Sequence, residues 1–255
     1  MGNMKNIILM ADGIVGLEVT KKLVASGEKI VRLYLHDDGV AKLAEEIKIA
    51  SGCKEVFNRS SLQNQNHIDD LRHIGADFII TVYWAHLLSA EVISCAVDTL
   101  NFHPALLPIN RGWFPHVHSI LDGSSLGVTL HRIENAADTG PIWVQKEVQL
   151  SPYDTAKTIY DRLQNEMIEI FNNNWPHIKS GKITPKNQRK DGACYHRKSE
   201  IAELDELDID TIMSVRELIN ILRARSFGDL GFAFYEENGA RVYLKISLSD
   251  SVNHS

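Results

Sequence analysis

Short apolar segments alternate along this chain with segments of helical periodicity. The apolar segments predict buried strands at residues 6–10, 29–35, 55–57, 77–82, 100–103, 128–133 and 142–148. Apolar positions three and four residues apart predict helices after a turn at 13–16 and at 40–50, 67–74, 91–96, 111–121 and 153–178. Strands that alternate with helices are typical of a parallel sheet covered on both faces. The sequence therefore predicts an α/β fold with a Rossmann-like, mostly parallel sheet flanked by helices.

The pattern changes near residue 180. The tail carries, in order, a polar segment at 182–199, an amphipathic helix at 215–224 and two apolar runs at 232–235 and 242–246. Between the two runs stands Asn238-Gly239, a strong hairpin signal because both residues accept the positive φ of a tight turn. We expect one domain at 1–180 and, at 181–255, a small C-terminal subdomain with a short helix and a β-hairpin.

Charge and cysteine content narrow the function classes. With 27 lysines and arginines against 33 acidic residues, the net charge is −6, which argues against nucleic acid as the main partner. Cys53, Cys95 and Cys194 lack the spacing of a disulfide framework or a cysteine zinc site. The apolar run from Ile7 is broken by Asp12 and is interpreted as a strand, not a signal peptide. We expect a cytoplasmic protein with no membrane partner.

Two polar motifs carry the candidate chemistry. Asn101 and His103 lie two residues apart in a predicted strand, so both side chains leave the same face while Phe102 points the other way. Pro104 has no N–H and places the pair at a strand end, where open α/β sheets bind ligands. The later run Asp-Thr-Gly-Pro at 138–141 supplies a carboxylate on a turn. An amide, an imidazole and the Asp138 carboxylate suit acyl transfer to an amine.

A dehydrogenase is an alternative from the residues alone. The turn at 11–16, Ala-Asp-Gly-Ile-Val-Gly, resembles a dinucleotide fingerprint whose first glycine is alanine. Asp37 and Asp38 close the next strand, about where a ribose-binding acid falls. This interpretation predicts an NAD-dependent enzyme.

Clustered histidines raise the further alternative of a metal-dependent hydrolase. His116 and His118, with His103 and His131, are the candidate ligands. Two helical histidines two residues apart lie on different faces, whereas ligand pairs on a helix need a spacing of four. We therefore interpret His118 and His131 as structural histidines with satisfied hydrogen bonds, and expect no metal.

The continuation of the motifs resembles a known family. The chain contains, in this order, Asn101-Phe102-His103-Pro104-Ala105-Leu106-Leu107-Pro108, Asn110-Arg111-Gly112, Gly127-Val128-Thr129-Leu130-His131 and Asp138-Thr139-Gly140-Pro141-Ile142, ending at Gln145. This series resembles the folate-dependent formyltransferases over roughly residues 5–180. Residues 110–120 and 222–227 are similar to the nucleotide-sugar N-formyltransferases in particular. Methionyl-tRNA formyltransferase instead carries a larger, basic C-terminal barrel, and the acidic tail here has the wrong sign for RNA.

The resemblance implies a catalytic domain at 1–180 that transfers the formyl group of N10-formyltetrahydrofolate to an amine of a nucleotide-linked amino-dideoxysugar. The first candidate is dTDP-4-amino-4,6-dideoxyglucose, for surface polysaccharide such as the O-antigen of lipopolysaccharide. The nucleotide base and the position of the amine, C3 or C4, stay open. Glycinamide ribonucleotide or another small amine is an alternative substrate, and a non-catalytic folate or nucleotide sensor is an alternative of another class. Similar enzymes also imply a homodimer through the C-terminal subdomain.

The resemblance also implies residue roles. Asn101, His103 and Asp138 form the catalytic group. Folate-binding positions are Tyr83, Trp84, His86, Leu88, Ile133, Asn135 and Asp138, although Tyr83 and Trp84 are equally well explained as core aromatics. Positions for the nucleotide sugar are Asn110, Arg111, Gly112, Trp113, Tyr195 and Arg197. For Arg197, Lys198 and Arg225 the simpler interpretation is an exposed, solubilising charge.

Overall fold

The computed structural model describes residues 3–37 and 43–250. The chain divides into two compact units. The first comprises Met1–His103, Val128–Lys146 and Gln164–Gln188, and the second comprises Pro104–Gly127, Glu147–Leu163 and Arg189–Ser255. These units interleave along the chain, whereas the domains expected from the sequence are consecutive. A domain boundary at residue 180 stays a prediction.

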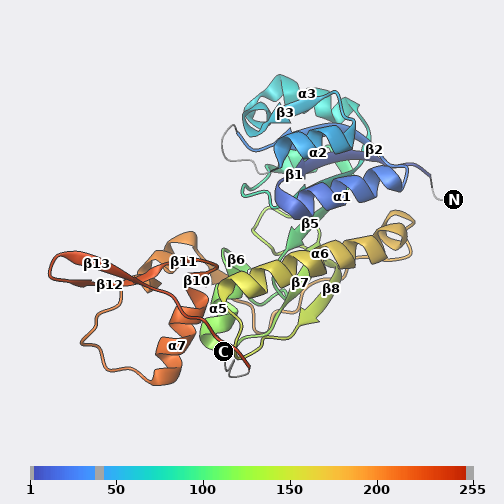
Figure 1. Ribbon diagram of the computed structural model, residues 1–255. Coiled ribbons are helices and arrows are strands. Elements are labelled where there is room, and N and C mark those ends of the chain that lie inside the picture. The colour runs from blue at the N-terminus through green and yellow to red at the C-terminus, as the bar shows by residue number, and fades with distance from the viewer. Residues whose placement is uncertain (1–2, 38–42, 251–255) are drawn as a thin grey trace. The chain divides into compact units, whose positions relative to one another are not determined.

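A seven-stranded sheet forms the core of the first unit (Figure 1). Its strands lie in the order β3 (Val56–Asn58), β2 (Lys29–Leu35), β1 (Asn6–Ala11), β4 (Ala76–Val82), β5 (Ala96–His103), β7 (Leu126–His131) and β8 (Ile142–Val148). The pairings from β3 through β5 are parallel, and β7 runs antiparallel to β5. The predicted α/β fold with a mostly parallel sheet is confirmed.

Helices bury both faces of this sheet. The described helices of the first unit are α1 (Gly13–Ala25), α2 (Ala44–Ser51), η1 (Arg59–Gln63), α3 (Gln65–His73), α4 (Ala90–Ile93) and the later part of α6 (Ala156–Lys179). Ile79 of β4 shares a buried cluster with Leu71 of α3 and Val92 of α4. Its neighbour Phe78 points to the other face and contacts Trp175 of α6, with ring centroids 5.3 Å apart. Residues 40–42 of the helix expected at 40–50 lie outside the described residues.

Shorter elements make up the second unit. They are β6 (Arg111–Gly112), α5 (Pro115–Asp122), β9 (Tyr195–His196), η2 (Lys198–Leu204), α7 (Val215–Ala224), β10 (Ser226–Phe227), β11 (Leu230–Gly231), β12 (Ala233–Glu237) and β13 (Ala240–Leu244), with the first turns of α6. Their core holds Val117, Ile120, Ala156, Ile201 and Ala224. The predicted hairpin is confirmed: β12 and β13 pair antiparallel around Asn238-Gly239, at φ of 50° and 78°.

The helix predicted at 111–121 is wrong in its first residues. Arg111–Gly112 form the short strand β6, which pairs with β9 out of the polar segment 182–199. The backbone has positive φ at Asn110, Gly112 and Phe114, which stops a helix from forming there. Helix α5 begins only at Pro115, a residue suited to the first helical turn.

No helix within residues 3–37 and 43–250 has the length and apolar character needed to cross a membrane.

Candidate active site

Asn101 and His103 meet Asp138 at one corner of the first unit. Both residues lie on β5, two positions apart and therefore on one face of the sheet. The chain returns through β7 and brings the Asp138 carboxylate to His103, with Oδ1 3.5 Å from Nδ1. His103 is buried, and the Asp138 side chain is 14% exposed. The structure thus brings together the three residues that the sequence predicts as catalytic.

His131 is a fourth member of this corner. The antiparallel register of β5 and β7 sets it directly opposite Asn101. The Nδ1–H group of His131 donates to the carbonyl of Arg132 at 2.6 Å, so Nε2 of the neutral ring is an acceptor. Asn101 donates to that Nε2 at 3.0 Å, and Asp138 Oδ1 lies 3.4 Å from it. His131 therefore has the satisfied hydrogen bonds expected, but it also touches two of the three candidate catalytic residues.

Thr81 fixes the other end of the Asn101 amide. It lies beside Asn101 in the parallel register of β4 and β5, and its hydroxyl donates to Oδ1 at 2.6 Å. An amide carries two N–H groups. Because the oxygen accepts from Thr81 and one N–H donates to His131, the orientation of the Asn101 amide is set from both sides.

The turn that carries Asp138 is held by its backbone. Asp138 has a φ of 55°, and Gln188 donates from Nε2 to the carbonyls of Asp138 and Gly140, both at 2.8 Å. A Cβ on Gly140 would lie 2.1 Å from the Arg132 carbonyl oxygen. Glycine is therefore required at 140 for the turn to pack this closely on the end of β7.

The loop after β4 holds the first group of residues assigned to folate. Tyr83 has a φ of 54°, and its carbonyl lies 3.2 Å from His36 Nε2. The Trp84 ring stacks on His36 with centroids 4.7 Å apart, and His86 contacts Trp84 edge-on. Burial and the nearby Arg59 charge lower the pKa of His86, which favours its neutral form. The stack gives Trp84 a structural role, and its role toward folate stays a prediction.

The other residues assigned to folate differ in exposure. Leu88 lies in the buried cluster with α3 and α4, and Ile133 packs against it while its N–H donates to Thr99 Oγ1 at 2.8 Å. Asn135 is exposed. Asp37, invoked for the dinucleotide alternative, is also exposed, and Asp38 lies outside the described residues.

The residues assigned to the nucleotide sugar all belong to the second unit. They gather around the pairing of β6 with β9: Asn110, Arg111, Gly112, Trp113, Tyr195 and Arg197. Tyr195 is 51% exposed, and Arg197 precedes η2 on the surface. The ammonium of Lys198 lies over the Trp113 ring, 5.1 Å from its centroid. These contacts place the six positions near one another in the fold of that unit.

The interpretation of Arg225 as an exposed, solubilising charge is wrong. It is 8% exposed and forms an ion pair with Asp205. Its guanidinium also lies over the Phe232 ring at 4.9 Å. The positive charge of Arg225 is therefore paired inside the second unit.

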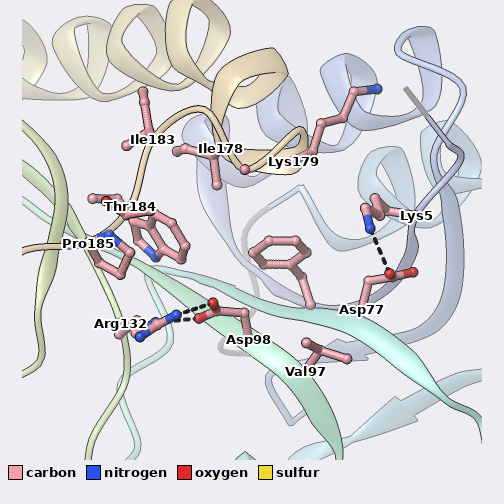
Figure 2. Close-up of a pocket in the computed structure, with 13 residues that line it drawn as sticks. Lys5, Asp77, Val97, Asp98, Arg132, Ile178, Lys179, Ile183, Thr184 and Pro185 are labelled. Atoms are coloured by element: carbon pink, nitrogen blue, oxygen red, sulfur yellow. Dashed lines mark hydrogen bonds and ion pairs between the residues drawn. The ribbon is translucent and has the colours of Figure 1, made fainter. Parts of the chain in front are cut away.

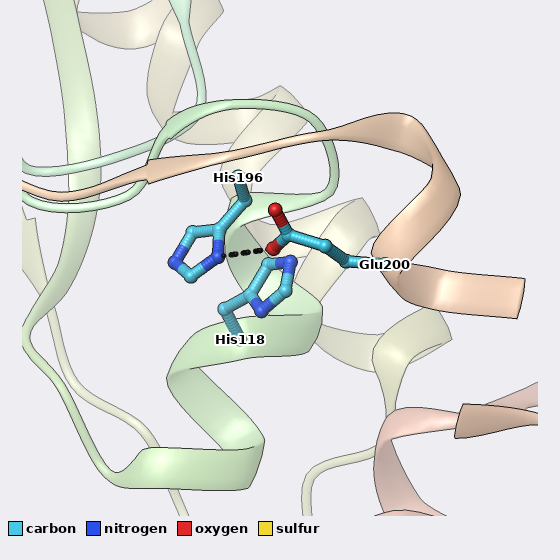
Figure 3. A group of neighbouring side chains, drawn as sticks. All are labelled: His118, His196 and Glu200. Atoms are coloured by element: carbon cyan, nitrogen blue, oxygen red, sulfur yellow. Dashed lines mark hydrogen bonds and ion pairs between the residues drawn. The ribbon is translucent and has the colours of Figure 1, made fainter. Parts of the chain in front are cut away.

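His118, His196 and Glu200 form a compact group (Figure 3). Their possible ligand atoms lie within 4.8 Å of one another. However, the two imidazoles stack nearly parallel, with centroids 3.4 Å apart. An imidazole ligand directs a lone pair in its ring plane at an ion about 2.0–2.1 Å away. An ion shared by two rings stacked face to face would lie outside both planes, so this arrangement does not fit a metal.

His116 and His118 are buried on α5. Among the described residues, neither His116 Nδ1 nor His118 Nε2 has a hydrogen-bond partner. Burial lowers the pKa of both rings to about 4, helped at His118 by His196. The expectation that the hydrogen bonds of His118 are satisfied is therefore wrong, because packing in the second unit excludes water from Nε2.

A shallow pocket of about 270 Å³ lies elsewhere in the first unit (Figure 2). Its charged side chains are already in ion pairs: Lys5 with Asp77, Arg132 with Asp98, and Lys179 with Glu28. Asp77 and Asp98 lie near the amino ends of β4 and β5. At about 3.3 Å per residue, Asp98 is about 16 Å along the strand from His103. This pocket is not part of the candidate active site.

Comparison with known proteins identifies the family. Residues 17–173, more than half of the chain, match the family described as formyl transferase. The chain belongs to this family. Residues 200–250 of this formyltransferase match the N-formyltransferase dimerization C-terminal domain. The dehydrogenase interpretation of residues 11–16 is therefore set aside.

Relatives with names and structures agree with this assignment. The formyltransferase is 31% identical over 173 residues to the dTDP-4-amino-4,6-dideoxyglucose formyltransferase of Mycobacterium tuberculosis (strain ATCC 25618 / H37Rv), covering 68% of this chain and 73% of that protein. A sugar N-formyltransferase from Shewanella sp FDAARGOS_354 has a TM-score of 0.83 at 23% identity, and a 4-N formyltransferase from Francisella tularensis has 0.83 at 24%. Each alignment covers 98% of this chain and 100% of the other. Because both identities are below 25%, the similarity to these two structures shows that this chain has the same fold, and nothing more.

Proposed function

We propose that this formyltransferase moves the formyl group of N10-formyltetrahydrofolate onto the amine of a nucleotide-linked amino-dideoxysugar. The first candidate acceptor is dTDP-4-amino-4,6-dideoxyglucose, the sugar named for the mycobacterial relative. An N-formyltransferase from Helicobacter canadensis was solved with folinic acid and dTDP-3-aminofucose, and its fold matches this chain with a TM-score of 0.71 at 18% identity over 94% of this chain and 86% of that one. We place the enzyme in the cytoplasm, in the synthesis of surface polysaccharide such as lipopolysaccharide O-antigen.

The observation that carries the proposal is the meeting of Asn101, His103 and Asp138. When the amine nitrogen attacks the formyl carbon, negative charge develops on the formyl oxygen. Among contacts with the described residues, Asn101 uses one amide N–H on His131, which leaves the second N–H for this oxygen. A donor that is already oriented costs no reorganisation in the transition state, and one such donor is worth roughly 10²–10³ in rate.

His103 and Asp138 support the proton transfers. The attacking amine must lose a proton and the departing N10 nitrogen must gain one. An imidazole titrates near neutrality and can do both. The Asp138 carboxylate, 3.5 Å from His103 Nδ1, orients the ring and favours its charged form. We assign His103 to proton transfer and Asp138 to orientation and charge stabilisation.

The two ligands draw on separate groups of residues. We assign folate to the loop after β4 (Tyr83, Trp84, His86 and Leu88) and to Ile133, Asn135 and Asp138. We assign the nucleotide sugar to Asn110, Arg111, Gly112, Trp113, Tyr195 and Arg197. Arg111 and Arg197 supply positive charge for a diphosphate, and the half-exposed Tyr195 ring supplies a face for a base.

We also propose a homodimer formed through the C-terminal subdomain. The name of the matched domain at 200–250 supports it, as do exposed apolar side chains in that segment. Those above half exposure are Ile209, Ile212, Val215, Leu230 and Tyr243. Light scattering of the full chain tests the dimer, and a monomer at micromolar concentration would contradict it.

The decisive experiment is an acceptor panel with N10-formyltetrahydrofolate, read by mass for the gain of one formyl group. We expect product with dTDP-4-amino-4,6-dideoxyglucose, while the 3-amino isomer and the UDP analogues test the amine position and the base. Turnover of glycinamide ribonucleotide alone would move the enzyme to purine synthesis. Ligand-induced stabilisation without any turnover would instead indicate a sensor.

A further inference from the structure

Two segments far apart in sequence are joined in the second unit. We call Asn110–Trp113 the substrate loop and Cys194–Glu200 the strap. Strands β6 and β9 pair in parallel, and two backbone bonds flank them: Arg111 N–H donates to the Cys194 carbonyl at 3.1 Å and Trp113 N–H to the His196 carbonyl at 3.0 Å. A Cβ on Gly112 would lie 2.3 Å from the His196 carbonyl oxygen. Backbone contact this close means that the strap determines where the substrate loop lies.

Asn110 anchors the loop from inside the second unit. Its side chain is fully buried and its φ is 55°. The amide nitrogen donates to Ser119 Oγ and Ser124 Oγ at 2.9 Å, and more weakly to the Pro115 carbonyl at 3.4 Å. These contacts turn Oδ1 toward the strap, where His196 Nε2 lies at 3.1 Å and the Cys194 thiol at 3.3 Å.

His196 links the substrate loop to η2 through Asn110 and Glu200. Figure 3 shows its contact with Glu200. Because Asn110 Oδ1 is an acceptor, His196 Nε2 carries a hydrogen. The other ring nitrogen, Nδ1, lies 2.9 Å from the Glu200 carboxylate, which also accepts from the Arg197 backbone N–H at 2.9 Å. The ring of His118 stacks on one face of the His196 ring. Glu200 and His118 thus fix the ring plane that aims Nε2 at Asn110.

We propose that His196 is a positioning residue for the nucleotide-sugar acceptor: its Nε2–H holds Asn110, and through it the substrate loop, in the conformation that binds. This inference rests on the proposed function and assigns a task to a residue outside the six assigned to the sugar. Without the imidazole, Oδ1 loses a strong donor, and the neighbouring Cys194 thiol is only a weak one. A backbone at positive φ then loses the contact that stabilises it, and Arg111 moves with it.

A pair of isosteric substitutions tests the Nε2 contact. The amide nitrogen of glutamine occupies the place of Nε2, and that of asparagine occupies the place of Nδ1. His196→Asn therefore keeps the bond to Glu200 and loses the one to Asn110, whereas His196→Gln does the reverse. We expect His196→Asn to raise KM for the dTDP-amino sugar about tenfold, the usual effect of losing one buried hydrogen bond. KM for folate and kcat should change less than about threefold, and His196→Gln should restore the acceptor KM.

A purely structural role predicts the opposite order. If His196 mattered only through Glu200 and the start of η2, His196→Gln would be the damaging variant and both kinetic constants would follow the melting temperature. Equal acceptor KM values for the two variants, in a wild type that formylates the sugar, would overturn the inference while leaving the proposed function standing.

A readout independent of turnover completes the test. Cys194 contacts Asn110, so loosening the loop exposes its thiol. We expect iodoacetamide to modify Cys194 several-fold faster in His196→Asn than in His196→Gln, measured by peptide mass. Equal rates would count against the inference even if the wild type formylated no nucleotide sugar, an outcome that separately refutes the proposed function.

Discussion

Each of the two units contains a hydrogen-bonded asparagine–histidine pair, and the two pairs differ in whether the asparagine amide donates or accepts the hydrogen bond. In the first unit Asn101 donates its N–H to His131 and keeps another N–H in a partly exposed corner. In the second unit Asn110 accepts from His196, and its fully buried amide has partners on both ends. The Asn110 amide is therefore used to hold a backbone, whereas the Asn101 amide keeps an N–H for the proposed contact with the formyl oxygen.

The largest expected effect is at His103, which lies beside the first pair. We expect His103→Gln to lower kcat by roughly 10²–10⁴, the range for loss of a general acid–base. The melting temperature should stay within a few degrees of wild type. Formyl transfer followed by mass spectrometry measures the rate, and a loss below tenfold would remove His103 from the proposed proton transfers.

Alanine at the two asparagines separates their roles. Asn101→Ala should lower kcat roughly 10²–10³-fold because an oxyanion donor is lost. Asn110→Ala should instead lower the free energy of unfolding by about 2–3 kcal/mol, since it leaves buried partners unsatisfied and puts alanine at positive φ. Urea unfolding measures the stability of both variants, and steady-state kinetics measure their kcat. Equal losses of stability and of kcat in the two variants would contradict the separate roles of Asn101 and Asn110.

Glycine-to-alanine changes probe the turn beside each pair. Gly140→Ala would press on the Arg132 carbonyl and displace Asp138, so kcat should fall, by up to about 10²-fold for a shift near 1 Å. Gly112→Ala would press on the His196 carbonyl and should act on the acceptor KM. Steady-state kinetics with folate and acceptor both varied distinguish an effect on kcat from one on the acceptor KM. A KM effect for Gly140→Ala together with a kcat effect for Gly112→Ala would contradict the assignment of the two turns.

The smallest expected effect is at His131. His131→Asn keeps a donor near the Arg132 carbonyl and removes the acceptor of Asn101, so kcat should fall about tenfold. His131→Gln keeps an acceptor in the place of Nε2 and should recover most of that loss. At His196, by contrast, we expect the same two substitutions to change the acceptor KM. If the His131 variants also changed the acceptor KM, the expected difference between the two histidines would be wrong.

The first unit was predictable because local rules determine it. Buried apolar runs fix its strands, and the period of two places Asn101 and His103 on one face. The contact with His131 was missed because it depends on the register of β7, which the sequence does not reveal. The structure shows this register: β7 runs antiparallel to β5 and brings His131 opposite Asn101.

The second unit was harder to predict because its elements are short and its contacts are distant. A two-residue strand such as β6 has no periodicity, and its partner β9 lies in a polar segment without a pattern. Positive φ at Asn110 and Phe114 also contradicts the helical spacing that predicted a helix from Arg111. By contrast, Asn238-Gly239 was informative because both residues favour that backbone.

The pairing of Arg111 with Tyr195 sets an order of events during synthesis. Asn110 must wait 84 residues for Cys194 to emerge, about 4–17 s at the usual speed of a ribosome, whereas Asn101 waits 30 residues for His131. On the nascent chain, the residues of the candidate active site up to His131 are therefore present well before the substrate loop can pair with the strap.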